Sequence, residues 1–184
     1  MGFGFLALPD AAGYVLEDAT VPASLVAGHV PTQPRDGLVR ADITVREGLI
    51  TALDAPGAPR PEGLAAVPLD GSMVFPCFVD AHTHLDKGHI WPRASNPDGT
   101  FPGALAAVGA DRERNWSADD VRARMTFALK AAHAYGTAAI RTHLDSIPAQ
   151  IDISWPLFAE IRAEWRGRID LQASSLCGID IAVE

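Results

Sequence analysis

Two histidines separated by one residue, His82 and His84, come directly after an apolar segment over residues 74–79. The sequence predicts that this segment is a buried strand. The two-residue period of a strand then puts both imidazoles on one face, about 6.5–7 Å apart along the chain. Imidazoles in that position can bind one divalent ion at Zn–N distances of about 2.0–2.1 Å. With Asp80 and Asp86 beside them, the pair predicts a metal site at the end of a strand.

From residue 71 onward, strand and helix signals alternate along the sequence. Ser117-Ala118-Asp119-Asp120 is similar to a capping box, with Asp in place of Glu, and predicts a helix that ends before Gly136. A strand is predicted over 137–143, a helix capped by Ser154 follows, and a third strand is predicted over 169–174. Strands that alternate with helices favour a parallel sheet.

Residues 86–116 show little periodicity and are predicted to form a loop of about 30 residues, longer than most connections between strands and helices. Loops of that size beside a site usually contact the substrate or close over it. The candidate contacts in this loop are Lys87, His89, Trp91, Arg93 and Trp116. For each of these side chains, simple packing or surface exposure is the alternative interpretation.

The first 70 residues carry the signals of short strands instead. Strands are predicted over 14–16, 38–45 and 49–53, and Glu47-Gly48 is predicted to turn the second strand back into the third. Loops rich in proline and glycine separate the other segments. The change of pattern predicts two regions with different architectures, 1–70 and 71–184.

The composition predicts a globular protein that binds neither nucleic acid nor membranes. The chain has 184 residues, a net charge of −8 and no stripe of basic residues. No apolar run approaches the about 18 residues of a membrane helix, and the apolar N-terminus lacks the basic start of a signal peptide. Cys77 and Cys177 are the two cysteines, and we expect both to be buried free thiols in a cytoplasmic protein.

The run from Phe75 to Lys87, with Leu69-Asp70-Gly71 before it, resembles the amidohydrolase superfamily. Residues 141–145 and 169–172 resemble the second and third barrel-strand regions of cytosine deaminase and the related s-triazine-ring aminohydrolases. The resemblance implies an α/β fold, a (β/α)₈ TIM barrel preceded by a small β-sandwich domain. Such a barrel needs about 250 residues. We therefore expect the N-terminal part only, with a partial composite sandwich over 1–70 and about three βα units over 71–184.

The same resemblance implies a metal-dependent hydrolase that acts on C–N bonds of a nitrogen heterocycle such as a pyrimidine or a triazine, by hydrolytic deamination. His82 and His84 would bind the divalent metal, Zn or Fe. The remaining ligands and the general acid/base are expected in an absent C-terminal part, so this chain is expected to be incomplete and inactive by itself. A cyclic-amide hydrolase of the dihydroorotase or hydantoinase type and a truncated non-catalytic remnant are the alternatives. Assembly into a homo-oligomer stays open.

Five further side chains are candidates for lining the substrate pocket or for orienting the metal ligands: Asp86, Lys87, His143, Asp145 and Cys177. We expect His143 to be held by Asp145 or by a backbone carbonyl. Pocket lining and direct ligation of the metal are the alternatives for this histidine. In the relatives, a glutamine after the third strand binds the heterocycle. A gapless match puts Gly178 near that position, so either recognition differs from that of cytosine or the match shifts by a residue or two.

Overall fold

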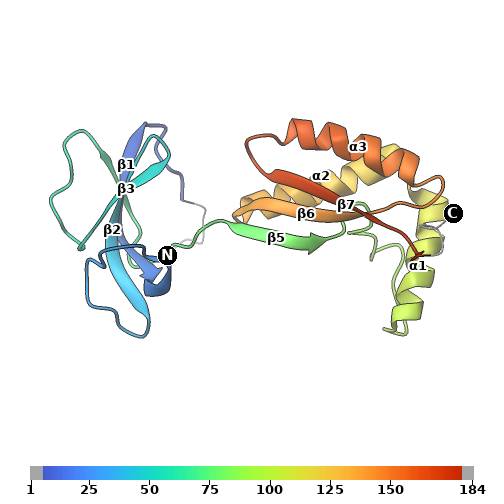
Figure 1. Cartoon of the computed structure of the whole chain (residues 1–184), viewed down its shortest axis with the longest axis horizontal. Coiled ribbons are helices and arrows are strands. Elements are labelled where there is room, and N and C mark those ends of the chain that lie inside the picture. Colours follow the sequence, from blue (N-terminus) through green and yellow to red (C-terminus); the bar gives the residue numbers. More distant parts are fainter. Residues whose placement is uncertain (1–5, 180–184) are drawn as a thin grey trace. The chain divides into compact units, whose positions relative to one another are not determined.

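The computed structural model describes residues 6–179, and the chain divides into two units between Pro76 and Cys77. The first unit contains one four-stranded sheet in the order β3-β2-β1-β4 (Figure 1). Its elements are β1 (Gly13–Pro22), the short 3₁₀ helix η1 (Ala23–Leu25), β2 (Leu38–Arg46), β3 (Leu49–Asp54) and β4 (Ala65–Pro68). Strand β1 is antiparallel to β2 and parallel to β4.

The turn between β2 and β3 follows from its two residues. Glu47 and Gly48 have φ angles of 51° and 76°, as the central positions of a tight hairpin require. They bring Arg46 opposite Leu49, so the predicted turn is confirmed. Within residues 6–76 the structure shows no second sheet that would close a sandwich.

The second unit is an α/β layer structure. Its three strands are β5 (Phe78–Thr83), β6 (Thr137–Asp145) and β7 (Asp170–Leu176), which pair in parallel in the order β5-β6-β7. Its helices are α1 (Phe101–Asn115), α2 (Ala118–Ala134) and α3 (Ile151–Glu164). Helices α2 and α3 cover one face of the sheet, and α1 lies at the end where the strands finish (Figure 1). The predicted parallel sheet is confirmed.

The core of the second unit lies between this sheet and helices α2 and α3. Strand β6 turns Ile140, Thr142 and Leu144 toward the helices, and these three side chains are at most 3% exposed. Arg141 and His143 alternate with them and therefore share the other face of the sheet. There the Arg141 guanidinium donates to Oε1 of Gln172 on β7 at 2.9 Å. The face without helices is consequently polar near the carboxyl ends of the strands.

The expected buried strand over 74–79 is wrong. Strand β5 begins only at Phe78 and continues through His82, and the side chains of Phe78 and Val79 are 58% and 70% exposed. Strand β5 is an edge strand of the described sheet, and α2 and α3 pack over β6 instead. The apolar segment therefore predicted that a strand lies in this region, but it did not predict that the strand's side chains are exposed.

Helix α1 occupies the second half of the segment that the sequence predicted to be a loop. Thr100 caps it, since its hydroxyl accepts from the Gly103 N–H at 3.1 Å, and Pro102 lies in its first turn. The helix presents no continuous apolar face, because Phe101 and Leu105 are 75% and 58% exposed. The periodicity that reveals an amphipathic helix is therefore missing from it.

The two predicted helix caps have different outcomes. Ser117 caps α2 as expected, since its hydroxyl accepts from the Asp120 N–H. The Asp120 carboxylate accepts from Arg93 and Arg124, so the reciprocal half of the capping box is absent. Ser154 caps nothing, because α3 begins three residues earlier at Ile151 and Ser154 is fully buried inside it.

Both cysteines are free thiols, as predicted. Their expected burial is wrong for Cys77, which is exposed where the second unit begins, whereas Cys177 is partly buried. Over residues 6–179, none of the helices has both the length and the apolar character to cross a bilayer.

Candidate metal centre

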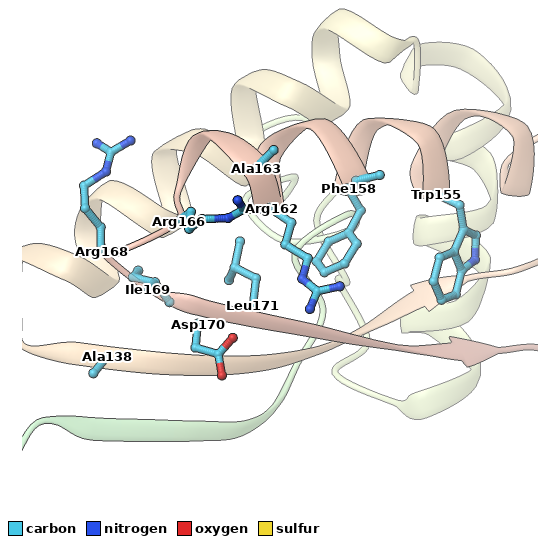
Figure 2. Close-up of a pocket in the computed structure, with 12 residues that line it drawn as sticks. Ala138, Trp155, Phe158, Arg162, Ala163, Arg166, Arg168, Ile169, Asp170 and Leu171 are labelled. Carbon is cyan, nitrogen blue, oxygen red and sulfur yellow. The ribbon is translucent and has the colours of Figure 1, made fainter.

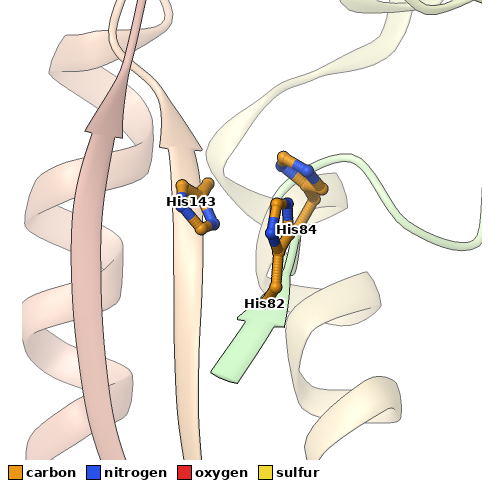
Figure 3. A group of neighbouring side chains, drawn as sticks. All are labelled: His82, His84 and His143. Carbon is orange, nitrogen blue, oxygen red and sulfur yellow. The ribbon is translucent and has the colours of Figure 1, made fainter. Parts of the chain in front are cut away.

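Three histidines gather at the carboxyl end of the parallel sheet (Figure 3). His82 comes from β5, His84 follows the end of β5, and His143 comes from the neighbouring strand β6. Each offers one ring nitrogen, and these nitrogens all lie within 4.8 Å of one another. The ring centroids are 5.4 Å apart for His82 and His84, and 4.4 Å apart for His82 and His143. The cluster therefore has the composition and spacing of a divalent-metal site.

A local irregularity in β5 shapes this cluster. Asp80 pairs with Ile140, but Thr83 pairs with Thr142, so β5 carries one extra residue between the two pairs. Such bulges re-aim side chains and leave a backbone group without a ladder partner. The His82 N–H donates instead to the Asp80 carboxylate at 3.1 Å. The convergence of His82 and His84 thus does not rest on simple two-residue alternation.

The environment of His84 favours the neutral imidazole that a metal requires. Partial burial is the main cause that lowers the pKa of His84 below its usual value. The charges of Lys87, His143 and His82 lower it further, and Asp145 opposes them. The Nδ1 atoms of His84 and of His143 are buried and accept or donate no hydrogen bond within the described part of the chain. Unpartnered ring nitrogens on two histidines of the cluster are compatible with a metal ion.

A buried carboxylate fixes the segment after His84 against β6. Asp86 is fully buried, and its Oδ2 accepts from the Asp145 N–H at 2.8 Å and from the Ser154 hydroxyl at 3.3 Å. The Leu85 N–H donates to the Thr142 hydroxyl at 2.9 Å. Burial raises the pKa of Asp86, and the hydrogen bond from Asp145 only partly opposes this effect. These contacts hold the two histidine-bearing segments side by side.

Asp145 in turn binds two cations. Its Oδ1 accepts from Lys87 Nζ at 2.7 Å, and its Oδ2 accepts from Arg112 at 3.0 Å. Asp86, Lys87 and Asp145, each singled out from the sequence, are therefore brought together in one network beside the histidines. The hydrogen bond expected between Asp145 and the His143 ring is absent from the described residues, and the Asp145 carboxylate accepts from the two cations instead.

Several residues of the site carried no recognisable sequence signal. Arg112 was hidden by the missed helix α1, and Thr142 and Ser154 lie 57 and 68 residues from the groups that they contact. Asp80 was visible beside the His-x-His pair, but its role toward the His82 backbone depends on the bulge. Only the residues adjacent to the pair itself could have been found from spacing.

The other predicted contacts of the loop over 86–116 are largely structural. Arg93 forms ion pairs with Asp111 and Asp120, and Trp116 is 4% exposed in the core. His89 packs edge-on against Phe127, and Trp91 is 64% exposed. Cys177 follows the end of β7 and is not a member of the metal-capable cluster in the described residues.

A pocket separate from the histidine cluster lies between α3 and β7 (Figure 2). Its lining includes Ala138 and Asp170, which lie at the amino ends of their strands, and Arg162 of α3. Sites in parallel α/β folds form at the carboxyl ends of the strands. The histidine cluster lies at that end, so we assign the candidate site to the histidines and not to this pocket.

The chain is similar to a curated pterin deaminase of Rhizobium rhizogenes (strain K84 / ATCC BAA-868). The two are 50% identical over 184 residues, which is all of this chain and 42% of that protein. The chain thus spans less than half the length of the relative that it matches. A scan against models of protein families gives no match.

Solved structures share the fold. The 5-methylcytosine deaminase of Klebsiella pneumoniae, liganded with 5-fluorocytosine, matches 86% of this chain and 35% of its own length, with a TM-score of 0.63 and 20% identity. The N-isopropylammelide isopropylaminohydrolase of Burkholderia multivorans ATCC 17616 matches 90% of this chain and 38% of its own length, with a TM-score of 0.59 and 23% identity. These matches show that the chain shares its fold with the matched parts of the two solved structures.

Proposed function

We propose that the protein that contains this chain catalyses the hydrolytic deamination of an amino-substituted nitrogen heterocycle, with a pterin as the first candidate substrate. The observation that carries this proposal is the 50% identity with a pterin deaminase along the entire chain. The histidine cluster at the carboxyl ends of β5 and β6 supplies the matching chemistry. In the reaction, water adds to the ring carbon that bears the amino group, and ammonia leaves.

His82 and His84 are proposed to hold a divalent metal, Zn or Fe. When bound, such an ion supplies a nucleophile at neutral pH, because it lowers the pKa of a bound water to about 7. The protein's part is to present neutral imidazoles, and the lowered pKa of His84 serves this purpose. The hydrogen bond between Asp86 and Asp145 joins the segment after β5 to β6, and Lys87 is paired with Asp145 beside them.

The residues after β7 support a substrate other than cytosine. Gly178, near the position where a gapless match places the heterocycle-binding glutamine of the relatives, is exposed and has no amide to offer. A glycine leaves space where a side chain would otherwise stand. We therefore propose recognition of a fused ring, with the polar contacts supplied by other residues.

We also propose the architecture that the resemblance implies. Residues 71–184 would form about three βα units of a TIM barrel, and residues 1–70 would form part of a sandwich. The parallel order β5-β6-β7 with helices on one face supports the first part of this proposal. The free thiols of Cys77 and Cys177 support a cytoplasmic location.

A chimaera tests the proposed activity, since the chain spans 42% of its relative. This chain replaces the matched region of the Rhizobium rhizogenes protein, and ammonia release from pterin, cytosine and a triazine is measured with added Zn or Fe. We expect metal-dependent release from pterin, and loss of activity in the His82→Ala form of the same chimaera. A chimaera that folds and binds metal, yet opens a cyclic amide and releases no ammonia, would establish the alternative hydrolase instead.

A further inference from the structure

We infer that Arg124 of helix α2 is a positioning residue of the candidate site. Its guanidinium holds the turn that follows β5, and this turn sets where the side chains of His84 and Lys87 lie. The inference rests on the proposed metal-dependent function and adds a residue to which neither the sequence motifs nor the histidine cluster points. Within the described residues, the side chain of Arg124 contacts the turn, Asp120 and Trp116, so it acts through the backbone of the turn.

The turn after β5 is closed by its own backbone. The N–H groups of Lys87 and Gly88 both donate to the His84 carbonyl, at 3.4 and 3.1 Å. The carbonyls of Asp86 and Gly88 accept from Arg124 instead, since its Nη1 donates to both, at 3.2 Å in the case of Gly88. These two carbonyls belong to the residues on either side of Lys87. One guanidinium nitrogen therefore fixes the peptide groups around Lys87.

The burial of Arg124 is not explained by packing. The residue is 7% exposed, and a buried charge needs hydrogen-bond partners. Its Nε donates to the Asp120 carboxylate at 2.9 Å, and its guanidinium lies 4.8 Å from the centroid of the Trp116 ring. Its Nη2 is buried without a partner in the part of the chain that the structure describes. An apolar side chain of similar length would fill this place without a buried charge, so the hydrogen bonds to the turn distinguish arginine from simple core packing.

The turn is held from two directions. Toward β6, the Asp86 side chain accepts from the Asp145 N–H at 2.8 Å, and the Leu85 N–H donates to the Thr142 hydroxyl at 2.9 Å. Toward α2, the Asp86 carbonyl accepts from Arg124. Loss of the arginine would keep the attachment to β6 and release the side of the turn that faces α2.

A small shift of this turn would move two side chains of the site. His84 is the first residue of the turn, and the Lys87 ammonium within it lies 2.7 Å from the Asp145 carboxylate. Binding sites need their side chains held to within about 0.5 Å. A helix that donates to the backbone of the turn meets this requirement without contacting a metal or a substrate.

Arg122 provides a matched comparison on the same helix. Its guanidinium binds Glu160 and Glu164 of α3, so it also joins two elements through charged hydrogen bonds. Those hydrogen bonds lead to α3 and not to the turn after β5. Loss of Arg122 therefore removes ion pairs of α2 and keeps the contacts of the turn.

The test compares metal binding by the 184-residue chain and three variants, without reference to activity. Arg124→Met removes the donors and keeps most of the side-chain length, Arg124→Lys keeps the charge without the planar fork, and Arg122→Met is the control. Zn affinity is measured by calorimetry, and the visible absorption of bound Co²⁺ reports the geometry of the site. Hydrogen exchange of the Lys87 and Gly88 amides in the metal-free chain reports on the turn itself. Urea unfolding gives the stability of each variant.

We expect Arg124→Met to weaken Zn binding by about 10-fold, the low end of what loss of a group that orients a metal ligand costs, and to change the Co²⁺ spectrum. The Lys87 and Gly88 amides should exchange faster in this variant by more than its loss of stability accounts for. Arg124→Lys should bind Zn more tightly than Arg124→Met and less tightly than the parent, because an ammonium can reach a carbonyl but cannot also span to Asp120. Arg122→Met should lose stability and keep the parent's Zn affinity and spectrum.

The inference is overturned if Arg124→Met unfolds at a lower urea concentration yet keeps the parent's Zn affinity and Co²⁺ spectrum, a result that leaves the proposed function intact. An equal loss of Zn affinity in Arg122→Met would also overturn it. If Arg124→Met does not fold, Arg124→Lys takes its place, and a Zn affinity equal to the parent's contradicts the inference. If the parent chain binds neither Zn nor Co²⁺, the proposed metal site fails and the inference fails with it.

Discussion

Asp86 combines full burial with a carboxylate, and two segments of the site depend on it. Its Oδ2 accepts from the Asp145 N–H and from the Ser154 hydroxyl, while its Oδ1 has no partner in the described residues. A buried carboxylate with one unsatisfied oxygen is costly, and the raised pKa of Asp86 reflects that cost. Its position gives it a structural role, since it joins the chain after His84 to the end of β6.

Replacing Asp86 with alanine should lower the free energy of unfolding by about 2–3 kcal/mol, because buried donors on Asp145 and Ser154 lose their acceptor. Asp86→Asn should lose less, since the amide oxygen can still accept and no charge is buried. Urea unfolding followed by tryptophan fluorescence measures both effects. Asp119→Ala, at an exposed position in the first turn of α2, is the control and should cost less than about 1 kcal/mol. Equal losses for Asp86→Ala and Asp119→Ala would show that the buried carboxylate has no special role.

At the scale of elements, Arg93 joins the loop after β5 to helices α1 and α2. Its guanidinium donates to Asp111 at 2.8 and 2.9 Å and also to Asp120. Burial alone would raise the pKa of Asp111, but hydrogen bonds from Arg93, Trp116 and Asn115 outweigh it and the pKa is lowered. For Asp120, the hydrogen bond from Arg93 is the largest cause of a lowered pKa. Arg93 thus fixes a segment that otherwise has few buried side chains.

Arg93→Ala should lower the free energy of unfolding by about 1–2 kcal/mol. This is less than breaking a buried ion pair costs, because the Arg93 side chain is 37% exposed and solvent screens its charge. Asp111 and Asp120 have lowered pKa values when folded, so the unfolded chain binds more protons in acid. Their contribution is complete above the unfolded pKa of about 4 and is lost as the pH falls through the folded values.

The parent chain should therefore lose stability in acid more steeply than Arg93→Ala, as measured by urea unfolding between neutral pH and pH about 3. Arg114→Ala is the control, because Arg114 is an exposed arginine in the last turn of α1. The stabilising role of the Arg93 ion pairs is refuted if the Arg93 and Arg114 variants have the same free energy of unfolding and the same dependence on pH.

Local patterns predicted the elements whose signals are complete within a few residues. The Glu47-Gly48 turn, the cap of α2 at Ser117 and the parallel strands all follow from such signals. Helix α1 did not, because its apolar side chains Phe101 and Leu105 face solvent and leave no amphipathic stripe. Sequence periodicity therefore identifies a helix only when the side chains that the helix buries form a regular apolar stripe.

The site was predictable only in part, for a related reason. The His82–His84 pair is visible in sequence because its members are neighbours, whereas His143 joins them through the parallel pairing of β5 with β6. The contacts that hold the network together join residues 57–59 positions apart. Ser154 was mistaken for a helix cap because its real partner, Asp86, lies 68 residues away in sequence. Contacts between residues so far apart in the sequence cannot be predicted from the spacing of residues along the chain.

At the scale of the whole molecule, the account rests on one claim: the carboxyl end of the parallel sheet binds a divalent metal through His82 and His84. Metal content by plasma emission, measured after loading with Zn and removal of unbound ions, tests this claim most directly. We predict one metal per chain in the parent protein and none in the folded double variant His82→Ala/His84→Ala. One metal per chain in that double variant would contradict the account, because the ion would then be bound elsewhere.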